Sequence, residues 1–201
     1  MLFEPTVLRD VPLCNMTPSE VHRLHAPVKA WFQQQGWTPQ AFQEEVWEAF
    51  AQGQNGLLQA PTGSGKTYAA MGHVLSAAAA STRSSRGVKL VWVAPLRALS
   101  ADIADAARAM VSGLGLDWEV GTRTGDTSAK EKAKQRTALP DILITTPESL
   151  HILLAQKGGA DRRVADQLNT LAANLRSDDN SAVTLQRLSS LSETLNGIAT
   201  K

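Results

Sequence analysis

The sequence is poor in the residues from which disulfide frameworks and metal sites are built. Its 201 residues contain one cysteine, Cys14, which excludes an internal disulfide and a thiolate zinc site. The four histidines are scattered along the chain, which excludes a histidine metal cluster. No apolar run reaches the roughly 18 residues of a membrane span, and the N-terminus lacks the basic and apolar regions of a secretory signal. These absences predict a cytoplasmic protein without a membrane partner.

Charge is sparse and unevenly distributed. Charged residues make up 19% of the chain and apolar residues 43%, which is enough to build a core and too little charge for a disordered protein. Residues 1–55 carry 3 Lys/Arg and 6 Asp/Glu, residues 56–160 carry 12 and 8, and residues 161–201 carry 5 of each. The mildly basic middle permits a nucleic-acid partner, but it lacks the dense basic stripe of a dedicated DNA-binding domain.

Residues 1–54 predict two helices. Thr17-Pro18-Ser19-Glu20 has the residues of a capping box with proline at the first helical position, and apolar residues follow at helical spacing up to Gly36. Pro27 is expected to kink or split this helix. Thr38-Pro39 starts a second helix that ends near Gly53. The tryptophans of this segment are expected to lie in the core: Trp31, Trp37 and Trp47.

From residue 55 the sequence alternates between short apolar strands and helices. A parallel α/β sheet with helices on both faces follows from this alternation. The expected strands are 56–60, 88–94, 118–120 and 141–145, and the expected helices end at Ala80, cover 99–111 and start at Pro147.

The composition changes again after Gly159, because all prolines and aromatic residues precede it. Residues 161–201 have leucines at helical spacing on both sides of a polar break at 177–181, which predicts a helical hairpin or coiled-coil-like tail. The chain is therefore expected to have three parts: N-terminal helices (1–54), an incomplete P-loop domain (55–160) and a helical tail (161–201).

Residues 60–67 (APTGSGKT) form the most specific motif, although Ala60 stands where the strict pattern has glycine. A glycine-rich turn lets consecutive backbone N–H groups face one concavity, and the helix that follows directs its positive end to the same place. Lys66 supplies a charge for phosphate oxygens, and the Thr67 hydroxyl can ligate Mg²⁺. The motif predicts a nucleoside triphosphate site, formed by Pro61, Thr62, Gly63, Ser64, Gly65, Lys66 and Thr67.

Further segments in a fixed order narrow this prediction. They are WTPQAFQ (37–43), PLRAL (95–99), TGDT (124–127) and TTPESL (145–150). Together with the phosphate loop, they resemble the first RecA-like domain of a superfamily-2 DExH-box helicase, and most closely the Lhr (large helicase-related) family. The resemblance covers about residues 25–158.

The resemblance implies an ATP-dependent DNA helicase with ATP and Mg²⁺ as cofactors and a role in DNA repair. Its partner would be single-stranded or duplex DNA, with RNA as a further option. Gln43 would read the adenine edge, and a second set of residues would follow one nucleic-acid strand: Arg97, Thr124, Gly125, Asp126 and Thr146. Contacts of this kind reach the phosphate backbone, so weak sequence specificity is expected.

Two other charged features have simpler interpretations. Glu148 is expected to stabilise the start of a helix electrostatically and not to be catalytic. The run at 130–136 (KEKAKQR) is expected to be the solvated face of a helix.

The resemblance also implies an Asp-Glu-x-His box on a further strand, where the aspartate holds Mg²⁺ and the glutamate orients the attacking water. No adjacent Asp-Glu pair occurs in the sequence. Ala165-Asp166-Gln167 has glutamine in the glutamate position, and Asp178-Asp179 is better explained as a helix N-cap. A second RecA-like domain with its arginine finger is absent from the 201 residues as well, so hydrolysis by this chain alone is not expected.

Three interpretations stay open at this point. The chain is a portion of a helicase that is interrupted before the box, or a non-catalytic module that binds nucleotide and single-stranded nucleic acid. In the third interpretation residues 161–201 supply self-association or bind a protein partner.

Overall fold

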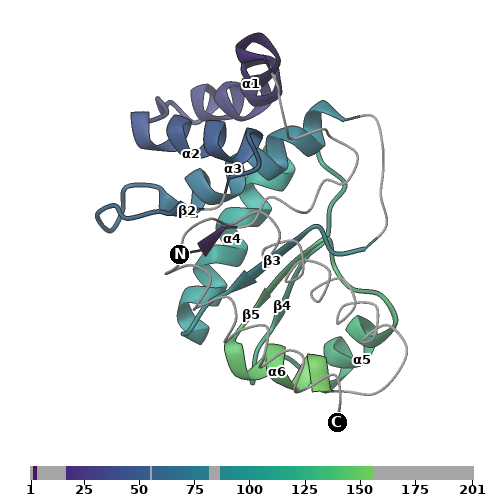
Figure 1. Cartoon of the computed structure of the whole chain (residues 1–201). Helices are drawn as coiled ribbons and strands as arrows, with labels where there is room; N and C mark the ends of the chain where they lie inside the picture. The colour runs from purple at the N-terminus through teal and green to yellow at the C-terminus, as the bar shows by residue number, and fades with distance from the viewer. Residues whose placement is uncertain (1, 4–16, 55, 82–86, 156–201) are drawn as a thin grey trace.

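The computed structural model describes residues 2–3, 17–54, 56–81 and 87–155 (Figure 1). Its elements are β1 (Leu2–Phe3), α1 (Pro18–Gln34), α2 (Ala41–Ala51), β2 (Gly56–Leu57), α3 (Lys66–Ala80), β3 (Leu90–Val93), α4 (Arg97–Gly113), β4 (Val120–Arg123), α5 (Ala129–Thr137), β5 (Ile142–Thr145) and α6 (Pro147–Ala155). The predicted tail at 161–201 lies outside the described residues, and so do Asp166, Gln167, Asp178 and Asp179.

Three strands form a parallel sheet in the order β3-β5-β4. The central strand, β5, is apolar along most of its length, and Ile142, Leu143 and Ile144 are fully buried. A continuous apolar run is typical of a strand covered on both faces, so the predicted α/β class with a parallel sheet and flanking helices is confirmed. Val93 and Arg123 are both in register with Thr145, so the three strands end at the same level.

The helices gather at two ends of the sheet (Figure 1): α1, α2 and α3 lie together at one end, and α5 and α6 lie at the other. α4 packs against the sheet and against α3. One hydrophobic cluster joins Trp31 and Trp47 of the N-terminal helices to Met71 of α3, Trp92 of β3 and Ile103 of α4. The core is thus continuous across the boundary predicted at residue 54.

The strand before the phosphate loop differs from its prediction. We expected residues 56–60 to belong to the parallel sheet, but β2 contains only Gly56 and Leu57 and pairs antiparallel with Leu2–Phe3. Leu57 is 71% exposed, which is not the environment of a strand in the centre of a sheet. Among the described residues, β3 is an edge strand of the parallel sheet, and Val93 on it is 44% exposed.

α1 continues through Pro27 as a single helix, so the proline does not split it. A proline has no backbone N–H to donate, and at this point a side chain from another helix forms hydrogen bonds with the backbone of α1. The buried hydroxyl of Ser76 on α3 donates to the Leu24 carbonyl (2.7 Å) and accepts from the Val28 N–H (3.2 Å). This hydroxyl bridges the donor and acceptor of one α1 backbone hydrogen bond and fastens α1 to α3.

A buried ion pair joins the amino ends of the strands. The Lys89 ammonium, before β3, pairs with the Asp141 carboxylate, before β5, and lies 5.1 Å from the centre of the Trp118 ring. Asp141 also accepts the N–H of Glu119, before β4 (2.7 Å). The nucleic-acid residues predicted from the sequence lie beyond the opposite, carboxyl ends of these strands. No helix in the described part of the chain is long and apolar enough to cross a membrane.

Candidate nucleotide and nucleic-acid sites

The phosphate loop runs from β2 to α3 and projects from the body beside α2 (Figure 1). Gly63 (φ 77°) and Gly65 (φ 83°) both adopt the left-handed conformation, which is strained for residues with a Cβ atom. Gly65 is also the N-cap of α3, so the backbone N–H groups at the positive end of that helix face the loop. This geometry is suited to binding an anion.

Lys66, the first residue of α3, spans the loop. Its ammonium donates to the carbonyl oxygens of Ala60 (2.7 Å) and Pro61 (2.6 Å). The Ser64 hydroxyl donates to the Pro61 carbonyl as well (2.8 Å). These partners are neutral dipoles, so a phosphate oxygen with full negative charge competes with them favourably for the ammonium. The lysine is therefore positioned to exchange loop carbonyls for a polyphosphate.

Gln43 connects α2 to the loop. Its side chain is buried, and its amide nitrogen donates to the Gly65 carbonyl (3.1 Å) while its amide oxygen accepts the N–H of Gln40 (2.9 Å). A Cβ atom on Gly65 would come within 2.7 Å of the Gln43 amide nitrogen. The structure thus brings the predicted adenine-reading residue and the phosphate loop together, and it gives the glutamine a structural task that the sequence did not reveal.

The prediction that all three N-terminal tryptophans lie in the core is wrong for Trp37. Trp31 and Trp47 are buried, but Trp37 is 45% exposed. It follows the end of α1 and packs against Tyr68 of α3, with ring centres 5.5 Å apart. Tyr68 lies 3.8 Å from the position of a Cβ atom on Gly65, so this half-exposed aromatic pair borders the phosphate loop. Trp37 was expected in the core because it is a tryptophan, but it follows Gly36 and lies outside the helical spacing of α1.

The residues of the loop fit a triphosphate with Mg²⁺. The glycines leave room for it, since a Cβ atom on Gly63 would meet nothing within 4 Å. Thr67 is partly buried in the first turn of α3 and carries the hydroxyl expected to ligate the ion. Mg²⁺ usually keeps several waters and is held by few protein groups together with substrate phosphates, so one hydroxyl from the protein suits this arrangement.

The predicted nucleic-acid residues gather beyond the carboxyl ends of the strands. Arg97 begins α4, Gly125 and Asp126 follow β4, and all three are exposed. Arg97 donates to the Asp126 carboxylate (2.7 Å), and both side chains are more than 60% exposed. The guanidinium lies over Gly125, where a Cβ atom would come within 2.6 Å of Nη2. Segments that are 28 residues apart in the sequence thus meet in one surface.

Thr124 and Thr146 occupy the same region but are buried, at 8% and 4% exposure. The Thr124 N–H donates to the Thr127 hydroxyl (2.9 Å), and the Thr146 hydroxyl accepts the N–H of Ser149 (3.4 Å) at the start of α6. These contacts fix the shape of the two loops. They leave the exposed Arg97 and Gly125 as the parts of the surface that a ligand reaches directly.

Glu148 lies in the first turn of α6, as predicted. Hydrogen bonds from its own backbone N–H and from the Thr146 hydroxyl, with a contribution from the positive charge of Arg97, lower the pKa of Glu148. Arg97 therefore has two acidic neighbours, Asp126 on the β4–α5 loop and Glu148 on α6.

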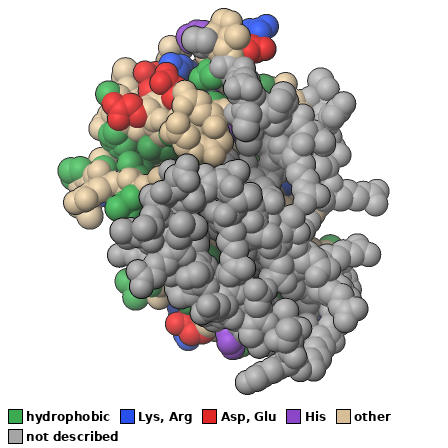
Figure 2. Space-filling model, viewed as in Figure 1, with side chains coloured by type: hydrophobic (Ala, Val, Ile, Leu, Met, Phe, Trp, Pro, Cys, Tyr) green, Lys and Arg blue, Asp and Glu red, His purple; other side chains and the backbone are tan. Residues whose placement is uncertain are grey.

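α5 contributes one residue that the sequence did not single out. Lys132 donates to the Gly125 carbonyl (3.1 Å), which places a second cation beside the loop that holds Arg97. Lys134 on the same helix pairs with Glu119, as expected for a solvated face. At the opposite end of the molecule, α2 carries three carboxylates, Glu44, Glu45 and Glu48, and Figure 2 shows red side chains there with blue ones nearby.

Comparison with known proteins identifies the class. The family model described as DEAD/DEAH box helicase matches residues 40–173, which include the phosphate loop and the surface around Arg97. The chain belongs to the DEAD/DEAH box helicase family.

Within this family the similar proteins are Lhr helicases, which confirms the resemblance found in the sequence. The chain is 32% identical to the "Lhr helicase/ probable uracil glycosylase" of Mycolicibacterium smegmatis over 188 residues, covering 86% of this chain and 12% of the relative. It is 34% identical to "ATP-dependent helicase Lhr-Core" of Methanothermobacter thermautotrophicus over 182 residues, covering 80% of this chain and 21% of that protein.

A solved structure gives the same result. The structure of Mycobacterium smegmatis helicase Lhr bound to ssDNA and AMP-PNP superposes with a TM-score of 0.58 at 32% identity, over 70% of this chain and 18% of that one. The predicted RecA-like helicase fold is thereby confirmed. The chain spans about a fifth or less of the length of these relatives.

Proposed function

We propose that this chain binds ATP with Mg²⁺ at the loop 60–67 and a single nucleic-acid strand across the loops after β3, β4 and β5. It would do so as a portion of an ATP-dependent Lhr-type helicase. The observation that carries the proposal is the position of Lys66 at the start of a helix, where its ammonium donates to two carbonyl oxygens of the loop. The solved Lhr relative was bound to ssDNA and AMP-PNP, which supports both ligands.

Each predicted site residue has a role in this proposal. Lys66 and the backbone of Pro61, Thr62, Gly63, Ser64 and Gly65 hold the phosphates, and Thr67 ligates Mg²⁺. Gln43 positions Gly65 and presents the remaining hydrogen of its amide to adenine. The exposed ring of Trp37 beside Tyr68 offers a stacking surface for the base. Thr124 and Thr146 shape the loops that present Arg97 and Gly125 to the nucleic-acid backbone, and Asp126 lies in the same surface, paired with Arg97.

We further propose that these 201 residues bind nucleotide without hydrolysing it. Phosphoryl transfer to water needs a carboxylate that orients the attacking molecule and a second one that holds the metal ion. The sequence contains no adjacent Asp-Glu pair. A role in DNA repair, a cytoplasmic location, the three-part domain division and self-association through 161–201 stay predictions of the sequence.

The test is binding of a fluorescent ATP analogue with Mg²⁺ to the full chain and to Lys66→Ala. Charge-assisted hydrogen bonds contribute about 1.5–3 kcal/mol each, so we expect the variant to lose at least about tenfold in affinity. Lys130→Ala is the matched control, because Lys130 is an exposed lysine on α5 at the other end of the molecule (Figure 1). Equal affinity of Lys66→Ala and the wild type would contradict the proposed site.

A further inference from the structure

Arg97 is the exposed cation at the centre of the candidate nucleic-acid surface, and it is already paired. Asp126 holds Nη1 at 2.7 Å, and Glu148 on α6 is its second acidic neighbour. Lys66 at the phosphate loop is held by neutral carbonyls instead. A phosphate that approaches Arg97 therefore meets a guanidinium that is already paired with a full negative charge.

The loop after β4 is built to hold this pair. Gly125 has no side chain to obstruct the guanidinium, which lies so close that a Cβ atom would be within 2.9 Å of Cζ. The Lys132 ammonium fixes the Gly125 carbonyl, and the Thr127 hydroxyl bridges the Thr124 N–H and the Thr122 carbonyl (2.9 and 3.2 Å). Asp126 is thus presented to Arg97 by a loop with its own internal hydrogen bonds.

We propose that Asp126 is an internal competitor for the nucleic-acid phosphate: its carboxylate occupies the Arg97 guanidinium until a backbone phosphate takes its place. This inference rests on the proposed function and assigns Asp126 a role opposite to that of a binding residue. Its carboxylate lowers the affinity for the nucleic-acid strand and raises the dissociation rate. A protein that moves along a strand needs contacts that are made and broken repeatedly, and a competing carboxylate at the contact provides this.

The test measures the affinity of the full chain for a fluorescent oligo(dT) by anisotropy, at several salt concentrations. Exposed ion pairs contribute about 0.2–1 kcal/mol, so Asp126→Asn is expected to bind about two- to fivefold more tightly than the wild type. The slope of log affinity against log salt should steepen by up to about 1, because Arg97 then gains a phosphate without losing a carboxylate. Arg97→Ala should weaken binding.

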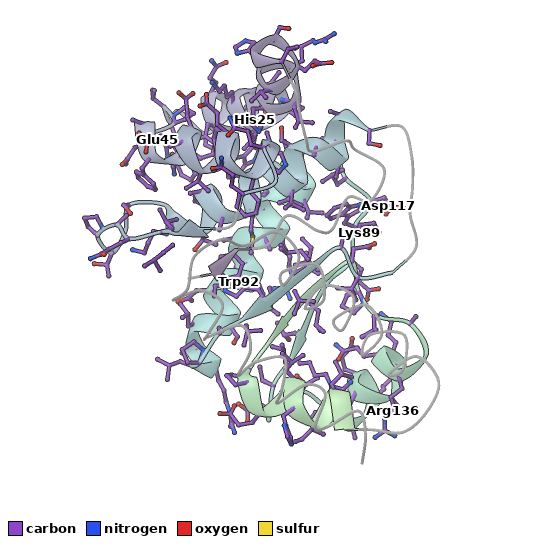
Figure 3. All side chains as sticks on the ribbon, viewed as in Figure 1. His25, Glu45, Lys89, Trp92, Asp117 and Arg136 are labelled. Carbon is purple, nitrogen blue, oxygen red and sulfur yellow. The ribbon has the colours of Figure 1, made fainter. Side chains whose placement is uncertain are left out.

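Two comparisons separate this role from general repulsion. Asp117→Asn changes the net charge equally, but Asp117 precedes β4 and lies near Lys89 at the amino ends of the strands (Figure 3), so its affinity should stay near that of the wild type. In the Arg97→Ala background, Asp126→Asn should have no effect, since the competed group is gone. Thermal unfolding of each variant shows whether it is folded.

The outcomes distinguish the two proposals. If the wild type binds and Arg97→Ala weakens binding, but Asp126→Asn matches Asp117→Asn or acts equally in the Arg97→Ala background, the competitor role is wrong and the proposed function stands. If neither the wild type nor any variant binds oligo(dT), the competitor role and the nucleic-acid part of the proposed function are both overturned, and ATP binding at the loop 60–67 is judged by its own test.

Discussion

The two ends of this molecule differ in the polar contacts that they make. At the α1–α2–α3 end three buried, neutral side chains donate hydrogen bonds to backbone carbonyls: Gln43 to Gly65, Ser76 to Leu24 and Trp47 to Ala69. At the α5–α6 end charged side chains form exposed ion pairs, Arg97–Asp126 and Lys134–Glu119.

The difference matches what each end is proposed to do. A buried polar group left without its partner costs about 1–3 kcal/mol, so the first end is a rigid frame that holds the phosphate loop in one shape. Exposed ion pairs contribute little to stability and are weakened by salt, so the second end can exchange partners easily. Substitutions at the first end should change folding, and substitutions at the second should change binding.

The largest effect is expected at Trp47. Its ring is fully buried between α2 and α3, its Nε1 donates to the Ala69 carbonyl (3.0 Å), and a Cβ atom on Gly72 would be 2.4 Å from that nitrogen. Trp47→Ala should lower the free energy of unfolding by about 3–5 kcal/mol, through the cavity and the lost hydrogen bond to a helix carbonyl. Urea unfolding followed by circular dichroism measures it.

The control is the same substitution at the half-exposed Trp37, which should cost clearly less because part of its ring already contacts water. If the two variants lost equal stability, the frame would not depend on the buried α2–α3 contact.

A smaller loss in the free energy of unfolding is expected when the pH is lowered. His25 and His73 are buried against each other, with Nε2 and Nδ1 2.9 Å apart, and His73 also stacks on Phe50. Burial, with a smaller contribution from Lys29, lowers the pKa of His25 to about 4. Burial, with a smaller contribution from His25, lowers the pKa of His73 to about 3.

Both values lie below the 6.5 of a solvated imidazole, so the unfolded chain binds more protons between these limits. The stabilising contribution of the neutral pair is complete above pH 6.5 and is lost as the pH falls toward 3. Each imidazole contributes up to about 1.4 kcal/mol per pH unit in this window. Unfolding in urea at pH 7.5 and pH 5 should therefore show a smaller loss for His73→Gln than for the wild type. His151→Gln, an exposed histidine on α6, serves as the control and should keep the wild-type difference.

The sequence predicted the fold where local pattern decides it. The apolar run of β5, the capping box before α1 and the glycines of the phosphate loop were each sufficient to place an element. The prediction that residues 56–60 join the parallel sheet was wrong, because strand pairing is a tertiary property. These residues have strand composition, but in the structure β2 pairs with Leu2–Phe3.

The candidate sites divide in the same way. A phosphate loop is a contiguous motif with a mechanism, so its residues could be found by reading the chain. The surface around Arg97 was found through family resemblance, and its internal pairing was not predicted, because Arg97 and Asp126 come from segments that only the parallel register brings together. Trp37 was misplaced because it was assigned to the core by residue type, whereas it lies in the connection between α1 and α2.

The smallest effect on the free energy of unfolding is expected at Gly65, where the same substitution should also weaken nucleotide binding. Alanine there meets both a φ of 83° and the Gln43 amide nitrogen at 2.7 Å, so Gly65→Ala should destabilise the chain by about 1–2 kcal/mol and weaken binding of the ATP analogue with it. Gly115→Ala is the matched control: its φ is 66° and a Cβ atom would meet nothing within 4 Å, so it isolates backbone strain from crowding. If Gln43 is what crowds Gly65, the added cost of Gly65→Ala should shrink toward that of Gly115→Ala in a Gln43→Ala background. An unchanged cost in that background would show that the glutamine does not set the shape of the phosphate loop, and that the loop is held by its own backbone alone.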